Sequence, residues 1–333
     1  MPSYSYPVRL EPASTLTPEQ VHTLLANPIT VAHRMASLVT DRFLADFLLP
    51  NRYSATGTGA VVYETTGDQV LLANDEPAVI AAGAEYPLSM VNRGGQYASI
   101  STIKRGLDSE VYDERIARGG LDPVNKTMRG LGNSLVKQHD RLGLAAIISK
   151  ATRTYDVSAD GGNFTTAEGI INAALFARVW AEEQGLDSYD YSTVLLKPRQ
   201  YAKIQSMLLG QNINSAAGVG PVLKTTPIYV EGLTFVTSPN APFVEPTLID
   251  RFALGGIVDE DLGSPGYVRA NTNGSALTTG GNGNDAPGTF VETKIQRLIG
   301  SDDRDGYRLR VRRVSVPLVT DSNAAIRLTN TGV

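Results

Sequence analysis

The most informative segment of the chain runs from Asn51 to Lys104 and reads NRYSATGTGAVVYETTGDQVLLANDEPAVIAAGAEYPLSMVNRGGQYASISTIK. Short β-branched runs, such as Val61–Val62 and Ile100–Ile103, alternate there with Gly, Thr and Ala, and six glycines interrupt them. This pattern predicts a long two-stranded ribbon with no core of its own. Such a ribbon is marginal alone in water, because it lacks a second layer to bury its apolar face. We therefore expect it to lie on a neighbouring subunit.

Composition indicates a folded protein with a substantial core. Of 333 residues, 42% are hydrophobic and 19% are charged, which excludes a disordered chain. The formal net charge of −4 argues against tight nucleic-acid binding through a generally basic surface. The absence of cysteine excludes disulfides and thiolate metal sites. The start has no basic and apolar regions of a signal peptide, and no apolar run approaches the roughly 20 residues that span a bilayer.

Residues 1–50 predict an amphipathic arm. Thr17 precedes Pro18, with Gln20 three residues after the cap, which is typical of a helix start. A second helical pattern runs from Thr30 to Leu48 and is ended by Pro50. Its apolar stripe consists of Val31, Met35, Leu38, Val39, Phe43, Phe47 and Leu48. Because the glycine-rich stretch isolates the arm, we expect this stripe to dock elsewhere; the nearby Asp41 and Asp46 disfavour a membrane-surface helix.

The segment from Ser109 to Lys150 predicts one long helical region. Asp108 and Glu110 would lie near its positive end, and Gly119-Gly120 would interrupt it. Asp122-Pro123 would restart the helix with a cap and an N1 proline. A continuous helix over 123–150 would be about 42 Å long, which suits a strut.

From Thr165 onward the pattern changes to mixed helices and strands. We expect helices over 166–184 and 198–209, strands over 192–196, 228–236 and 248–258, a Gly- and Asn-rich loop over 263–288, a hairpin of 290–299 with 307–316, and a last strand over 324–328. On the second hairpin strand, Tyr307, Leu309 and Val311 would face one way. Arg308, Arg310 and Arg312 would face the other.

This order of parts resembles the major capsid protein of tailed bacteriophages, the Hong Kong 97-type fold, across essentially the whole chain. The resemblance implies an α+β fold with an N-terminal arm, an extended β-ribbon loop, a long spine helix, a peripheral domain and an axial domain. The corresponding segments are the arm 1–50, the extended loop 51–104, the spine helix with the first part of the peripheral domain 105–164, the axial domain 165–288, the peripheral-domain β-hairpin 289–318 and the return strand to the axial domain 319–333.

By this resemblance, the chain would assemble into hexamers and pentamers of an icosahedral shell that encloses double-stranded DNA without sequence-specific binding. It would be part of the virion, assembled in the host cytoplasm, with no membrane partner. Because the arm is short, scaffolding would be a separate protein; portal and decoration proteins are further candidate partners. The ribbon has no lysine between Asn51 and Ile103, so the Lys–Asn isopeptide cross-link of some relatives is not expected.

Three alternative functions stay open from the sequence. An encapsulin-like nanocompartment shell would use the same architecture around an enzyme cargo. A soluble α/β hydrolase or metal enzyme with a long insertion would be a monomer or small oligomer. A ring-forming connector would give closed rings of fixed number.

No motif predicts catalysis, a cofactor or a metal. His22, His33 and His139 have no catalytic motif nearby, so surface or packing positions explain them better. The Gly57-x-Gly59 pair lacks the third glycine of a dinucleotide site, and residues 263–266 lack the G-x-S-x-G pattern. Residues 280–285 match part of one calcium-binding repeat, but such sites need stacked copies. Asp302, Asp303 and Asp305 predict an acidic hairpin turn, with a weak ion at a subunit junction as the alternative.

The arginine row is the most informative charge feature. We expect it to pair with acidic residues, in the same chain or across a subunit boundary, since bidentate pairs fix register; a solvated strand face is the alternative. The negative net charge disfavours DNA contact by this row. The candidate subunit-contact residues are Asp75, Glu76, Asp113, Glu114, Arg308, Arg310, Arg312, Phe43 and Phe47.

Overall fold

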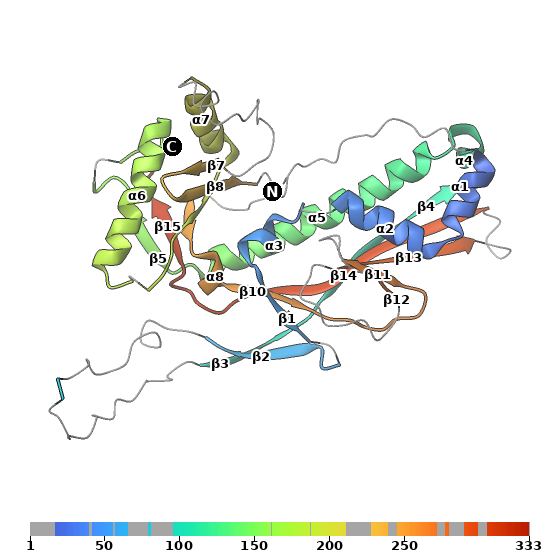
Figure 1. Ribbon diagram of the computed structural model, residues 1–333, viewed down its shortest axis with the longest axis horizontal. Helices are drawn as coiled ribbons and strands as arrows, with labels where there is room; N and C mark the ends of the chain where they lie inside the picture. The colour runs from blue at the N-terminus through green and yellow to red at the C-terminus, as the bar shows by residue number, and fades with distance from the viewer. Residues whose placement is uncertain are drawn as a thin grey trace.

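The computed structural model has an elongated body with a ribbon projecting from it (Figure 1). It describes residues 17–39, 42–55, 57–65, 79–80, 96–160, 162–186, 188–210, 228–238, 245–271, 277–279, 290–298 and 305–332. The expected features at 280–285, at Asp302 and Asp303 and at Asp75 and Glu76 lie outside these residues.

The arm forms three helices in the described residues. The first, α1 (Pro18–Leu25), has the expected capping box, in which the backbone N–H of Thr17 donates to Gln20 Oε1 over 3.0 Å. The single helix expected over 30–48 is instead α2 (Pro28–Val39) and α3 (Leu44–Leu48). Both pack on α5 of the same chain: α2 shares an apolar core with the first half of α5, and α3 shares a second core with its last turns. The arm is therefore not isolated from the body.

The ribbon segment divides into two structural parts. Strand β1 (Asn51–Ser54) joins the large sheet in parallel with β10 (Gly255–Asp259). Strands β2 (Ala60–Glu64) and β3 (Tyr97–Ser101) form the expected antiparallel ribbon, with Val62 opposite Ser99. The sequence prediction of a two-stranded ribbon is confirmed for these described ends.

The helical region expected from Ser109 starts later than predicted. Residues 104–112 form β4 (Lys104–Tyr112), so Asp108 and Glu110 are strand residues and not helix N-terminal acids. The reason is that β4 pairs along its length with β14 (Gly306–Val319), and this tertiary pairing outweighs the local helical pattern. Helix α4 (Asp113–Gly119) follows. The predicted glycine break then separates it from α5 (Asp122–Lys150), whose N-cap is Leu121 and not Asp122.

The spine helix α5 covers one face of a seven-stranded peripheral sheet. The strand order is β1-β10-β14-β13-β11-β12, and β4 also pairs with β14. Here β13 is Phe290–Leu298, β11 is Val268–Asn271 and β12 is Leu277–Thr279. The predicted hairpin of β13 and β14 is confirmed.

Successive residues of β14 face opposite sides of the peripheral sheet, as in any strand. Tyr307, Leu309 and Val311 are buried in the core shared with α5 and α2. Val316 and Leu318 pack against the base of the ribbon. The spine helix and the ribbon base therefore lie on opposite faces of the sheet, as their positions in Figure 1 also show.

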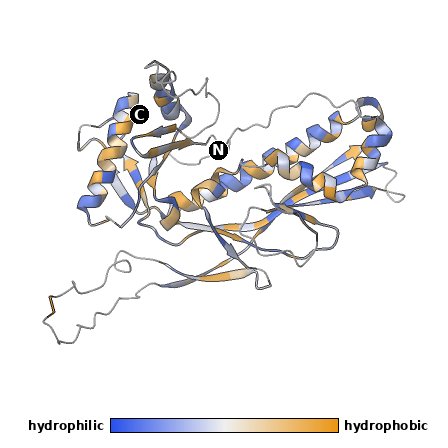
Figure 2. Cartoon of the chain, viewed as in Figure 1, coloured by the Kyte–Doolittle hydropathy of each residue, from blue (hydrophilic) through white to orange (hydrophobic). Residues whose placement is uncertain are grey.

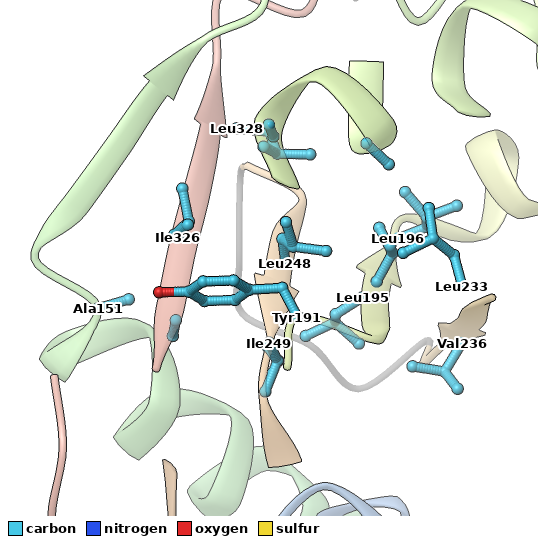
Figure 3. Packing of buried hydrophobic residues seen from close by; sticks show 14 of the residues in the cluster. Ala151, Tyr191, Leu195, Leu196, Leu233, Val236, Leu248, Ile249, Ile326 and Leu328 are labelled. Atoms are coloured by element: carbon cyan, nitrogen blue, oxygen red, sulfur yellow. The ribbon is translucent and has the colours of Figure 1, made fainter. Parts of the chain in front are cut away.

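The other end of the body is the axial unit, a six-stranded sheet in the order β5-β15-β9-β6-β8-β7. These strands are β5 (Arg153–Asp156), β15 (Ala325–Thr329), β9 (Thr247–Ile249), β6 (Thr193–Leu196), β8 (Leu233–Thr237) and β7 (Ile228–Val230). Helices α6 (Ala167–Glu183) and α7 (Pro198–Gly210) accompany the sheet where the sequence predicts them. Figure 3 shows its core, in which Tyr191 lies across Leu248 and Ile326.

The chain leaves the axial sheet near residue 250. Strand β9 belongs to the axial sheet, whereas β10 follows the short helix α8 (Arg251–Leu254) directly and joins the peripheral sheet. Strands β10, β11 and β12 were expected in an axial domain over 165–288, yet they pair within the peripheral sheet. The remaining domain boundaries stay a prediction.

Candidate subunit-contact surfaces

The arginine row of β14 forms a ladder of ion pairs with neighbouring strands of its own chain. Arg308 Nη2 lies 2.6 Å from Glu110 Oε1, and Arg310 Nη2 lies 2.6 Å from Asp108 Oδ2. The register explains both pairs, because Arg308 is opposite Glu110 and Arg310 is opposite Asp108 across β4 and β14. Hydrogen bonding to Arg310 lowers the pKa of Asp108 below its usual value.

The third rung of the ladder is buried. Arg312 Nε donates to Glu292 Oε2 over 2.5 Å, on the neighbouring strand β13. The guanidinium also lies 3.6 Å from the ring centroid of Tyr267. Each arginine of the row therefore has a carboxylate in its own chain, and the expected pairing occurs within one subunit.

Of the four acidic residues predicted as partners of the row, Asp113 and Glu114 are described, and neither pairs with it in the described structure. Asp113 binds Arg297 instead, with Nη1 2.7 Å from Oδ1, and this pair lowers the pKa of the carboxyl. Glu114 is exposed on α4. Charge type alone did not identify the partners, since strand register selected Asp108 and Glu110, which the sequence had placed at a helix start.

The two arm phenylalanines differ in position. Phe43 is 3% exposed within the core that joins the arm to α5, so its side chain is not available to a neighbouring subunit. Its ring makes an edge contact with His139 at 5.3 Å between centroids. Phe47 is half-buried, and the Arg251 guanidinium lies 4.1 Å from its ring centroid. A contact role for Phe47 stays a prediction.

A buried charge cluster lies where α3, α5 and β14 meet. Asp46 on α3 receives two hydrogen bonds from Arg313, at 3.0 and 3.1 Å. Arg52 Nη1 and His139 Nε2 approach the same carboxylate at 3.6 and 3.3 Å. Despite its burial, the pKa of Asp46 is well below its usual range, because Arg313 and His139 favour the ionised form. Burial and Arg313 lower the pKa of His139 to about 4, so the ring is neutral at pH 7.

The next residue of α5 has the opposite behaviour. Asp140 is 3% exposed, and its Oδ1 accepts a hydrogen bond of 3.0 Å from the backbone N–H of Ala45. Burial, with a smaller contribution from Asp46, raises the pKa of Asp140 to about 8. This cluster fixes the arm on the spine and was not recognised from sequence, because its members are scattered along the chain.

The histidines occupy packing or surface positions. His22 Nδ1 is 3.2 Å from the Tyr307 hydroxyl, and His33 is exposed on α2. Across the part of the chain that the structure describes, no three His, Asp or Glu side chains are placed to hold a metal ion. In that same part, no helix is long and apolar enough to cross a membrane.

The ribbon has one packed and one open face. Val61, Tyr63 and Ile100 rest on Ala55, Val258 and Leu318 of the body. The Thr102 hydroxyl donates to Glu260 at the ribbon base. On the other face, Val62 is 69% and Tyr97 is 77% exposed. The open face therefore presents two large apolar side chains beside the exposed Ser99 and Ser101, and its burial on a neighbouring subunit stays a prediction.

Further exposed apolar side chains lie on the axial unit and at α8. They are Phe176 and Val179 on α6, Tyr229 on β7 and Phe252 on α8. The helical spacing of the first two could have been found in the sequence, but their exposure could not.

Comparison with known protein families identifies the chain. A family model described as phage capsid protein matches residues 96–328, well over half of the sequence. The chain belongs to the phage capsid protein family. This confirms the resemblance to tailed-phage major capsid proteins, and the α+β architecture confirms the predicted fold class.

Solved capsid structures are similar in fold at low identity. The capsid of cyanophage P-SCSP1u has a TM-score of 0.48 and 11% identity, covering 84% of this chain and 85% of that one. A virus-like particle from Pyrococcus furiosus has a TM-score of 0.48 and 12% identity, covering 93% of this chain and 98% of that one. The structure from Mycobacterium phage Che8 has a TM-score of 0.47 and 13% identity, covering 100% of this chain and 98% of that one. No curated protein matches the chain.

This phage capsid protein is therefore a structural shell subunit that assembles with copies of itself. Its candidate contact surfaces are the open ribbon face and the exposed apolar side chains of the axial unit.

Proposed function

We propose that this capsid protein builds an icosahedral head shell of hexamers and pentamers around double-stranded DNA, with the ribbon lying on an adjacent subunit. The open ribbon face is the observation that supports this arrangement. Val62 and Tyr97 leave apolar area in water, while the described residues of the ribbon pack on the body through the opposite face. Burying this area on a neighbour contributes about 25 cal/mol per Å².

Shell strength then comes from many modest contacts. The ion-pair ladder stays within each subunit, so it stiffens the peripheral sheet and does not itself join subunits. The ribbon carries apolar contact area outward from a body that the arm, the spine and the buried charge cluster hold together. The chain acts without catalytic chemistry, in the virion, after assembly in the host cytoplasm. Separate scaffolding, portal and decoration proteins complete the head.

Assembly of the full-length chain tests this function. We expect negative-stain electron micrographs of the purified protein to show closed particles. Val62→Asp should abolish particles, because a carboxylate on the ribbon would have to be desolvated against the neighbour. The matched variant Val62→Ile should still assemble. Unchanged far-UV circular dichroism of both would show that the subunit itself is folded.

Four results would contradict the proposal. Unaltered particles from Val62→Asp would show that the open ribbon face makes no subunit contact. A stable monomer of the unmodified protein, or rings of fixed number, would exclude the shell. Particles that carry an enzyme and no DNA when purified from infected cells would favour the encapsulin-like alternative.

A further inference from the structure

The peripheral sheet gives the subunit two faces of different electrostatic character. On the ribbon side, the partly exposed Arg308 and Arg310 of β14 are paired with carboxylates of β4. On the helix side, the surface is formed by α2 and α5. The two sides of a shell subunit therefore present different charge to their surroundings.

The outer face of α5 carries an excess of positive charge. Its cations are Lys126, Arg129, Lys137, Arg141 and Lys150. The acidic residues of α5 are Asp122, which is partly exposed in the first turn four residues before Lys126, and Asp140, which is buried. Among the residues that the structure describes, none of the five cations forms a salt bridge, whereas each arginine of the β14 ladder forms one.

Four of these cations form one stripe, which we call the spine stripe: Lys126, Arg129, Lys137 and Arg141. At about 100° per residue, they fall within an arc of about 120° on the helix surface. Three of them are exposed and Arg129 is partly exposed. The stripe runs from residue 126 to residue 141, a rise of 15 residue steps or about 23 Å. Figure 2 shows hydrophilic positions along α5 beside the hydrophobic ones that face the sheet.

The side chains between the cations indicate the kind of partner. Gly130, Asn133, Ser134 and Gln138 lie on the same side of α5 and are small or uncharged polar residues. None of the exposed large hydrophobic side chains in the described structure lies on α5. A docked amphipathic peptide helix would need apolar anchors here. Phosphates need cations and neutral hydrogen-bond donors, which the stripe supplies.

We propose that the spine stripe binds the phosphate backbone of double-stranded DNA without reading its sequence. The inference rests on the proposed function and adds to it the surface of the subunit that faces the genome. Each subunit contributes up to four phosphate contacts, and the chain as a whole remains negative at −4. The net negative charge of the rest of the surface repels phosphate and so confines DNA contact to the stripe. Each copy of the subunit in a shell presents the same stripe.

The test compares two variants of equal charge. The stripe variant replaces all four cations of the spine stripe with glutamine. The control variant replaces four exposed cations outside the stripe, Lys104, Arg115, Arg118 and Arg199, with glutamine. Each of the two fourfold variants has a formal net charge of −8, four below the −4 of the unmodified protein. Because all eight side chains are at least partly exposed, both variants should keep the circular dichroism spectrum of the unmodified protein.

Binding is measured by fluorescence anisotropy with a short mixed-sequence DNA duplex. The full-length chain is kept below the concentration at which light scattering detects shells, so that both faces are accessible. We expect the stripe variant to bind at least about tenfold more weakly at about 100 mM salt. The slope of log affinity against log salt should become shallower by about 3 to 4. The control variant should bind within about threefold of the unmodified protein, since it retains the stripe contacts.

Two outcomes would overturn the proposal. If both variants lose DNA affinity equally, or if neither loses any, the stripe is not a DNA site. If a polyglutamate peptide binds the unmodified protein as tightly as the duplex and loses affinity in the stripe variant, the stripe serves an acidic protein partner. Electron micrographs of the unmodified protein report separately on shell formation, so failure of the proposed function is distinguishable from failure of this inference.

Discussion

Asp140 provides the most direct test of the buried cluster. Its carboxyl is fully enclosed between α5 and the arm, and burial raises its pKa to about 8 from an ordinary value of 3.8. Asp140→Asn replaces a neutral carboxyl with a neutral amide of the same shape. The amide oxygen can still accept the hydrogen bond from the backbone N–H of Ala45.

The sign of the pH dependence follows from proton binding. Between pH 4 and 8 the unfolded chain loses the Asp140 proton while the folded chain keeps it, so rising pH favours unfolding. Each pH unit in this window lowers the free energy of unfolding by about 1.4 kcal/mol. From pH 5 to pH 8 the unmodified protein should therefore lose about 4 kcal/mol relative to Asp140→Asn. Above about pH 8 the difference should stay constant.

Urea unfolding at matched protein concentration, from pH 5 to pH 9, measures this difference through the midpoint and slope of each curve. Other titrating groups are present in both proteins, so their contributions cancel to first order in the comparison. Asp113→Asn is the control. Hydrogen bonding to Arg297 lowers the pKa of Asp113, so the stability that this pair contributes to the fold is lost only as pH falls toward that pKa. Between pH 5 and 8, the difference in unfolding free energy between Asp113→Asn and the unmodified protein should therefore not change with pH. Parallel pH profiles for Asp140→Asn and the unmodified protein would refute the reasoning.

Two further predictions concern the contact between the arm and the spine. Asp46→Asn leaves the buried guanidinium of Arg313 without its bidentate carboxylate. In urea unfolding, this variant should have a free energy of unfolding about 3–5 kcal/mol lower than the unmodified protein, and a loss below about 1 kcal/mol would contradict the pairing of Asp46 with Arg313. Gly143→Ala places a Cβ against that of Ala45 on α3 and should lower the free energy of unfolding by about 1–3 kcal/mol. Gly130→Ala, on the open face of the same helix, should raise it by up to about 1 kcal/mol. Equal shifts of the melting temperature in the two variants would show that α3 does not pack against Gly143.

Local sequence signals predicted most elements of this capsid protein. The capping box at Thr17, the glycine break at Gly119-Gly120 and the hairpin of β13 and β14 are where the pattern indicated. Each of these signals acts through neighbours in sequence: a side chain capping a backbone N–H, a residue type that tolerates unusual dihedral angles, or alternation along one strand.

The prediction was wrong where distant parts of the chain decide the structure. Residues 109–112 have helical spacing, yet they form β4 because β14 offers a partner along the whole strand. Phe43 looked available to a neighbour, yet it is enclosed by α5. The partners of the arginine row follow from register, which pairs Arg310 with Asp108 across about 200 residues.

The order of the parts, the ribbon with no core of its own and the long spine all follow from the sequence alone. Only the tertiary structure decided which charges are neutralised. Ion pairs form between side chains that the sheet register and the α3–α5 contact bring within a few ångströms. The β14 arginines and Arg313 thereby acquire carboxylates, whereas the four cations of the spine stripe form no salt bridge among the described residues.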